Sequence, residues 1–151
     1  MEIEKAIKQN TKFRSSHEKA AVNLIYTSSW FKDIQNALFK DHSILPQHYN
    51  VLRILKGRHP EPVSPGTIKE VMLEKNNDVT RLLDKLVTKG LAKRQLCPVN
   101  RRKMDINITD KGIKLLLELD EPMKKHLSEM KKKLTEKEAE QLSQLLDKMR
   151  G

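Results

Sequence analysis

Most hydrophobic residues of the chain recur at the three- and four-residue spacing of amphipathic helices. Ser15 with Glu18 three residues later has the pattern of a capping box, and the apolar positions that follow predict a helix to about Lys40. These apolar positions are Ala21, Leu24, Phe31, Ile34 and Leu38. A second helix is expected to begin at Pro46 and to end at Gly57. The segment 58–65, which carries three prolines, is predicted to be a loop.

Two further helices are predicted between residues 64 and 90. Ser64 can cap a short third helix that opens at Pro65 and buries Ile68, Val71 and Met72. A polar turn at 75–78 leads into a fourth helix, which Gly90 can end in a left-handed conformation. The fourth helix has one apolar stripe, formed by Val79, Leu82, Leu83, Leu86 and Val87, and its opposite face is polar.

The residues after the fourth helix have the pattern of a β-hairpin. Segments 91–96 and 103–108 read as strands, and Met104, Ile106 and Ile108 alternate along the second. The loop between them, 97–102, is too long for a two-residue turn and places Arg101 and Arg102 near its tip. A helix, a short helix, an amphipathic helix and then a hairpin follow one another in the order of a winged helix-turn-helix. The predicted fold is therefore mainly α with a small antiparallel β-hairpin wing.

The C-terminal forty residues predict two more helices. Thr109 can cap a long one whose apolar positions are Ile113, Leu116, Leu117, Met123, Leu127, Met130 and Leu134, and Pro122 is expected to kink or restart it. Thr135 and Glu138 form a second capping box, before a last helix with the stripe Ala139, Leu142, Leu145, Leu146 and Met149. A single chain of this size has little core to cover such a stripe, which favours a partner over packing within a monomer.

Positive charge is concentrated where the fourth helix and the hairpin are predicted. The chain of 151 residues has a net charge of +10, and residues 81–103 hold eight basic residues against Asp84 alone. Asn77, Arg81 and Lys85 follow one another four residues apart, so one helix face carries donors for phosphates and base edges. The alternative is an ordinary solvated face.

Other function classes find less support in the sequence. The five histidines are scattered without ligand spacing, and no glycine-rich phosphate loop is present, so we expect no catalytic residues, no metal and no cofactor. No apolar run approaches 18 residues, the first ten residues lack a secretory signal, and the single Cys97 cannot form an intramolecular disulfide. We therefore expect a cytoplasmic protein without a membrane segment. Cys97 fits an apolar strand-end residue better than a redox sensor.

The stretch VTRLLDKLVTKGLAKR, followed by NRRKMDINITDKG, closely resembles the MarR family of bacterial and archaeal transcriptional regulators. The resemblance runs from about Pro46 to Gly112. It aligns residues 76–81 with the start of the family's recognition helix, and Arg101 with the wing arginine that reaches toward the minor groove. Asn100 departs from the family pattern, because many relatives carry an aspartate there that holds the wing arginine. We therefore expect a more mobile wing.

The resemblance implies a homodimeric, ligand-responsive repressor that binds double-stranded DNA at a pseudo-palindromic operator. Residues 1-40 and 112-151 would form a helical dimerisation lobe, and 41-111 the winged helix-turn-helix DNA-binding lobe. A small aromatic effector is expected near Tyr26, Trp30 and His48, although such residues are more often part of a core. The residues expected to contact DNA are Asn76, Asn77, Asp78, Thr80, Arg81, Lys85, Arg101, Arg102 and Lys103.

Two other functions remain open at this stage: a non-specific architectural nucleic-acid-binding protein, and a protein-interaction module without sequence readout. Binding to single-stranded RNA is disfavoured, because stacking on bases needs aromatic side chains and the chain has only six.

Overall fold

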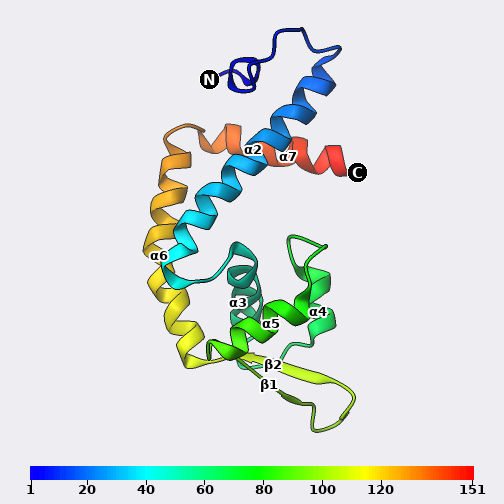
Figure 1. The fold of residues 1–151 in the computed structure, drawn as a ribbon, viewed down its shortest axis with the longest axis vertical. Coiled ribbons are helices and arrows are strands. Elements are labelled where there is room, and N and C mark those ends of the chain that lie inside the picture. Colours follow the sequence, from blue (N-terminus) through cyan, green and yellow to red (C-terminus); the bar gives the residue numbers. More distant parts are fainter. The chain divides into compact units, whose positions relative to one another are not determined.

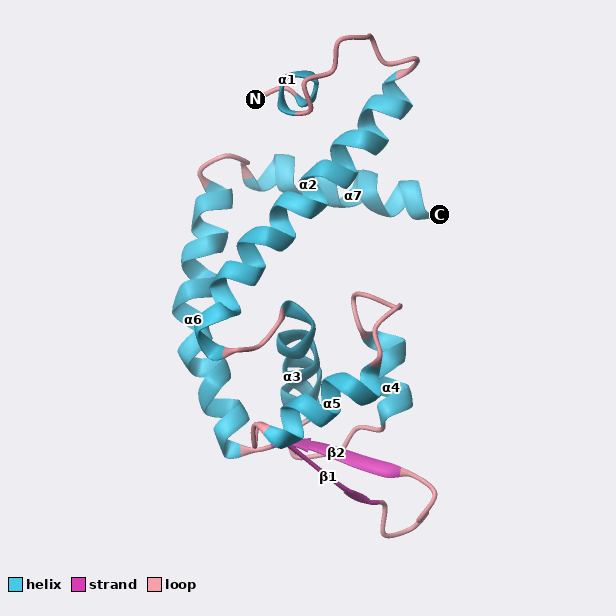
Figure 2. Cartoon of the chain, in the orientation of Figure 1, coloured by secondary structure: helices cyan, strands magenta, loops and turns pink.

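The computed structural model describes residues 1–151, which are mainly helical with one two-stranded antiparallel sheet (Figures 1 and 2). This confirms the predicted fold class. The chain divides into two compact units, Met1–Pro46 and Gln47–Gly151. The elements are α1 (Ile3–Ala6), α2 (Ser16–Phe39), a 3-10 turn η1 (Lys40–His42), α3 (Pro46–Arg58), α4 (Pro65–Val71), α5 (Val79–Thr88), β1 (Ala92–Leu96), β2 (Met104–Ile108), α6 (Asp110–Lys131) and α7 (Glu136–Arg150).

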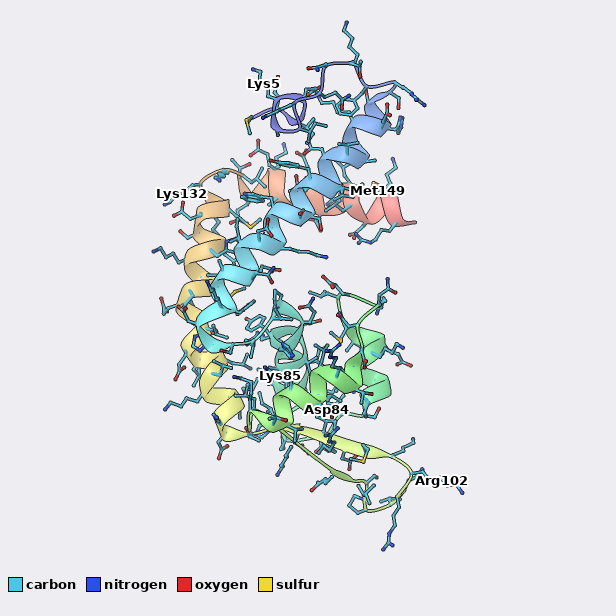
Figure 3. All side chains as sticks on the ribbon, viewed as in Figure 1. Lys5, Asp84, Lys85, Arg102, Lys132 and Met149 are labelled. Carbon is cyan, nitrogen blue, oxygen red and sulfur yellow. The ribbon has the colours of Figure 1, made fainter.

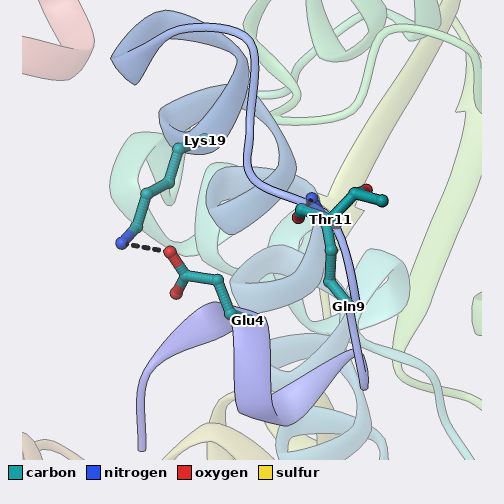
Figure 4. A network of polar contacts seen from close by, with 4 residues as sticks. All are labelled: Glu4, Gln9, Thr11 and Lys19. Atoms are coloured by element: carbon teal, nitrogen blue, oxygen red, sulfur yellow. Dashed lines mark hydrogen bonds and ion pairs between the residues drawn. The ribbon is translucent and has the colours of Figure 1, made fainter.

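The N-terminal unit consists of α2 and a short arm that folds back on it. Ser15 caps α2 as predicted, since its hydroxyl accepts a hydrogen bond from the Glu18 amide at 3.1 Å. The Glu18 carboxylate accepts from the Arg14 amide at 2.6 Å, so the returning bond lies one residue earlier than a capping box requires. The arm, including α1, was not predicted, and Glu4 ties it to α2 by an ion pair with Lys19 at 2.5 Å (Figure 4).

The second unit is built around the predicted stripe of α5. Val79, Leu82, Leu83 and Leu86 are all buried, together with residues of α3, α4 and the hairpin. The prediction for Val71 was wrong, because this side chain is 46% exposed. Helix α4 ends at Val71, and the next residue, Met72, is extended and buried; the predictions for Ile68 and Met72 are confirmed.

The hairpin pairs Ala92 with Ile108 and Leu96 with Met104, as expected from the alternating pattern. Segment 58–65, which was predicted to be only a loop, adds one residue to this sheet. The amide of Val63 donates to the carbonyl of Ile106, and the amide of Ile106 donates back to Val63, both at 2.9 Å. Buried Val63 therefore joins the hairpin to the helical core.

The C-terminal part of the second unit contains two long helices. The Thr109 hydroxyl accepts from the Gly112 amide at 3.1 Å, which confirms the predicted cap of α6. Helix α6 then continues through Pro122 without a restart, because a missing N–H removes one backbone bond and leaves the following turns intact. Its buried residues are Leu115, Leu116 and Leu119, while Leu117, which was predicted to belong to the apolar stripe, is exposed.

Helix α7 begins at the predicted capping box. The Thr135 amide donates to the Glu138 carboxylate at 2.8 Å, and the Glu138 amide donates to the Thr135 hydroxyl at 3.3 Å. No residue of α7 is buried. Across the whole chain, no helix combines the length and the apolar character that a membrane crossing requires.

Candidate nucleic-acid interface

The polar face of α5 carries two cations that have no counter-ion. Arg81 and Lys85 are exposed one helical turn apart, on the side opposite the buried stripe, and neither forms an ion pair; Figure 3 labels Lys85 on this helix. Thr80 is exposed as well. Because the first turn of a helix also presents unpaired N–H groups and a partial positive charge, this end of α5 favours a polyanion.

The turn that precedes α5 uses two of the predicted contact residues to shape the backbone. The side-chain amide of Asn77 donates to the Glu74 carbonyl at 3.1 Å. One carboxylate oxygen of Asp78 accepts from the Arg81 amide at 3.1 Å, so Asp78 is the N-cap of α5. Both side chains therefore stabilise the start of α5. Asn76, at the beginning of this turn, is exposed.

The tip of the wing presents a second cluster of cations. Arg101, Arg102 and Lys103 are exposed and form no ion pairs, and Arg102 lies at the end of the hairpin (Figure 3). The Asn100 side chain accepts from the backbone amide of Arg102 at 3.1 Å. Asn100 thus fixes the backbone of the loop and does not hold the guanidinium of Arg101. Cys97 is half-buried at the start of this loop.

The acidic residue beside Arg81 and Lys85 on the exposed face of α5 is already neutralised. Asp84, on α5, forms an ion pair with Arg94 of β1 at 2.7 Å. The exposed cations without an ion pair include Arg81 and Lys85 on α5, Lys93 on β1, and Arg101, Arg102 and Lys103 at the tip of the wing. The surface is therefore positive, and it consists of a helix and a projecting hairpin.

The three residues of the predicted effector site lie in different parts of the chain. Tyr26 and Trp30 are partly exposed on α2 in the N-terminal unit, and the Trp30 ring lies 6.5 Å from that of Phe31. His48 belongs to α3 in the second unit and is only 6% exposed. Burial lowers the pKa of His48 below its ordinary value, and the charges of Lys85 and Lys89 lower it further. His48 is therefore neutral near pH 7.

A junction behind α5, which the sequence did not reveal as a unit, fixes the direction of this helix. Gly90 ends α5 with a φ of +70°, and its carbonyl accepts from the Thr109 hydroxyl at 2.6 Å. The Lys111 ammonium caps the carbonyl of Lys89 at 2.8 Å. Gly112 packs so closely that a Cβ there would lie 2.3 Å from the Leu91 carbonyl oxygen. The sequence predicted the helix end at Gly90 and the cap at Thr109 separately, but not that the two residues are hydrogen-bonded to each other.

No three side chains of His, Cys, Asp or Glu come together as metal ligands.

Comparison with known proteins agrees with this architecture. No family model matches the chain. A MarR transcription factor from Planctomyces limnophilus, known from a crystal structure, shares 32% sequence identity with this chain. The match has a TM-score of 0.70 and covers 90% of this chain and 98% of that one. A mutant MarR from E. coli complexed with operator DNA is 26% identical, with a TM-score of 0.72, over 84% of this chain and 91% of that one. The HTH-type transcriptional regulator MhqR of Bacillus subtilis is 28% identical over 87% of this chain and 92% of its own length. The chain therefore belongs to the MarR family of transcription factors, which are not enzymes.

Proposed function

We propose that this transcription factor is a homodimeric repressor that binds a pseudo-palindromic operator and is released by a small aromatic effector. DNA binding rests on one observation above all: five cations on α5 and at the tip of the wing have no counter-ion, and Asp84, which lies beside Arg81 and Lys85, is paired with Arg94. The E. coli relative, whose structure contains operator DNA, supports the same function.

The two parts of this surface would take different roles on a duplex. Arg81 and Lys85, with Asn76 and Thr80, lie at the end of α5 that would enter the major groove. Asn77 and Asp78 would support them by holding the first turn. On the wing, Arg101 would reach the minor groove, while Arg102 and Lys103 would contact phosphates.

A homodimer follows from the apolar side chains that one chain leaves uncovered. Helix α7 has no buried residue, and Leu145, at the middle of its stripe, is 64% exposed. Ile25 on α2 is exposed to a similar extent. Two copies would cover these stripes with a lobe made from residues 1–40 and 112–151, and the lobe 41–111 of each copy would bind one half-site.

The proposed effector site includes His48, which lies on α3 in the second unit. His48 is close enough to Lys85 and Lys89 for their charges to lower its pKa. An aromatic acid bound at His48 would therefore act directly beneath the helix that reads DNA. Tyr26 and Trp30 supply aromatic surface of the kind such a ligand needs.

The DNA-binding proposal can be tested without knowing the operator. The wild-type protein is used to select a duplex from a randomised pool, and binding to that duplex is compared with binding to sheared genomic DNA in gel-shift assays at several salt concentrations. A repressor should bind the selected duplex about 10³-fold or more tightly than the competitor. Arg81→Ala and Arg101→Ala should each weaken specific binding by roughly tenfold or more.

Lys137→Ala is the matched control, because Lys137 is an exposed cation on α7. This variant should bind as the wild type does. Equal affinity for selected and competitor DNA would overturn sequence-specific binding and favour an architectural role. Unchanged affinity in both arginine variants would exclude this surface as the binding site.

The dimer is tested by light scattering of Leu145→Glu. A charge in a buried interface is expensive, so this variant should shift toward the mass of one chain and lose operator affinity. A wild-type protein that is monomeric at micromolar concentration would refute the homodimer.

A further inference from the structure

The ion pair between Asp84 and Arg94 joins the two halves of the candidate interface. Asp84 belongs to α5 and Arg94 to β1, and their side chains meet at 2.7 Å. The orientation of Arg94 follows from the strand register, because it pairs with Ile106, which is fully buried. Arg94 therefore lies on the face of the hairpin that packs against α5.

Taken alone, a carboxylate at position 84 would oppose DNA binding. It is one helical turn from Arg81 and adjacent to Lys85, on the face that a phosphate backbone would approach. Arg94 cancels this repulsion, and in doing so it fixes β1 to the recognition helix at a point between the helix and the wing tip. The side chains are 55% and 35% exposed, so the pair adds little to folding stability.

We propose that Asp84 and Arg94 are positioning residues that set the angle between the wing and α5, and so determine whether both can contact one operator half-site. This inference rests on the proposed function, because the angle between the wing and α5 affects binding only if both contact the same duplex. Neither side chain needs to contact DNA. Their effect is on specificity, since non-specific binding does not require the wing and the helix to be in register.

The proposal predicts different outcomes for the two single substitutions. Asp84→Ala releases Arg94 and removes a negative charge, so affinity for sheared genomic DNA should rise while affinity for the selected duplex falls. The ratio of the two should drop by about tenfold, the usual effect of one misplaced contact. Arg94→Ala leaves Asp84 uncompensated and should weaken binding to both DNAs. The exchange Asp84→Arg with Arg94→Asp restores the pair and should recover most of the specificity ratio.

Lys93→Ala is the matched control for Arg94→Ala. Lys93 is exposed, has no ion-pair partner, and pairs with Asn107 in the register, so it lies on the other face of the hairpin. Its loss removes the same charge without detaching β1. The control should therefore leave the specificity ratio at the wild-type value.

Footprinting separates positioning from direct contact. In Asp84→Ala, hydroxyl-radical protection of the minor groove at the wing should be lost, while methylation protection of guanines in the major groove should persist. An unchanged specificity ratio in Asp84→Ala would overturn the proposal, and so would an exchange variant whose ratio stays as low as that of Asp84→Ala. A changed preference at a single base pair would also overturn it, because Asp84 would then read a base directly. If the wild-type protein selects no duplex at all, the proposed function fails, which is a separate result.

Discussion

Gly112→Ala tests the junction that fixes α6 to the end of α5. A Cβ at this position would lie 2.3 Å from the carbonyl oxygen of Leu91 and 2.7 Å from Cγ1 of Ile108. The Leu91 carbonyl cannot simply rotate away, because it accepts a hydrogen bond from the Thr109 amide at 3.1 Å. The added methyl group must therefore push α6 away from β1 or break that bond.

The size of the effect follows from three contributions. Alanine is favoured over glycine inside a helix by about 1 kcal/mol. Overpacking against fixed neighbours costs about 1–3 kcal/mol, and the upper end applies here because carbon–oxygen contacts normally stay near 3.3 Å. Weakening the bond to the Leu91 carbonyl costs about 1 kcal/mol more. We therefore expect the free energy of unfolding to fall by about 2–3 kcal/mol, which lowers Tm by roughly 4–12 °C.

The measurement is urea and thermal unfolding followed by far-UV circular dichroism, at one fixed protein concentration because a dimer's stability depends on it. Gly57→Ala is the control, since it makes the same substitution in α3, where nothing lies within 4 Å of the new methyl group. It should stabilise the protein by about 0.5–1 kcal/mol. A Gly112→Ala variant as stable as the wild type would show that α6 is not held against β1 in this way.

Three smaller predictions concern the helix ends and the buried histidine. Asp78→Ala should lower the free energy of unfolding by about 1 kcal/mol in urea titrations, whereas Asp78→Ser keeps an acceptor for the Arg81 amide and should be close to neutral; equal losses would exclude the cap. Thr109→Val removes both the cap of α6 and the bond to Gly90, and should cost about 1–2 kcal/mol by the same assay. The pKa of His48 is lowered by burial, so below its ordinary value of 6.5 the unfolded chain binds a proton that the folded chain does not, and stability should fall as the pH decreases through and below 6.5. His48→Gln should lose that part of the pH dependence, and an identical pH profile would contradict the assignment.

The elements of the second unit could be predicted because local chemistry and hydrophobic period agree there. The stripe of α5, the caps Ser64, Thr109 and Thr135, and the alternating strand β2 all formed as the sequence indicated. Each of these signals depends on residues within a few positions of one another, so no tertiary information is needed to read it.

The sequence-based predictions were wrong where a residue far away in the chain determines whether a position is buried or paired. Val63 lies among prolines and reads as loop, yet it pairs with Ile106, which is 43 residues away in the chain. Val71 and Leu117 belong to apolar runs but are exposed, whereas Leu115, which the predicted stripe did not include, is buried, because helix length and packing partners set the final face. Contacts across such separations leave no periodic trace in the sequence.

In the candidate site, too, only the features that depend on neighbouring residues in the sequence could be predicted. The cations on α5 and the wing were visible as a local excess of charge, but the functions of their neighbours were not. Contact of Asn77 and Asp78 with DNA stays a prediction, but the sequence did not show that their side chains also bond the backbone of the turn and of the first helical turn. A short polar residue near the start of a helix can cap the helix or bind a ligand, and its residue type is the same in both cases. Only its hydrogen bonds in the structure distinguish the capping role from the binding role.

The junction at Gly112 also explains how a change in α6 can affect DNA binding. The Lys89, Gly90 and Leu91 carbonyls all contact the first turn of α6, through Lys111, Thr109 and Gly112 respectively. Thr109 and Lys111 make these contacts through their side chains, whereas the backbone of Gly112 lies directly against the Leu91 carbonyl, where no rotamer can adapt. A displacement of the first turn of α6 must therefore be passed to the end of α5 and to β1. Because Arg94 of β1 is paired with Asp84 of α5, the wing and the recognition helix would move together, and their distance from a second half-site would change while their own geometry is kept.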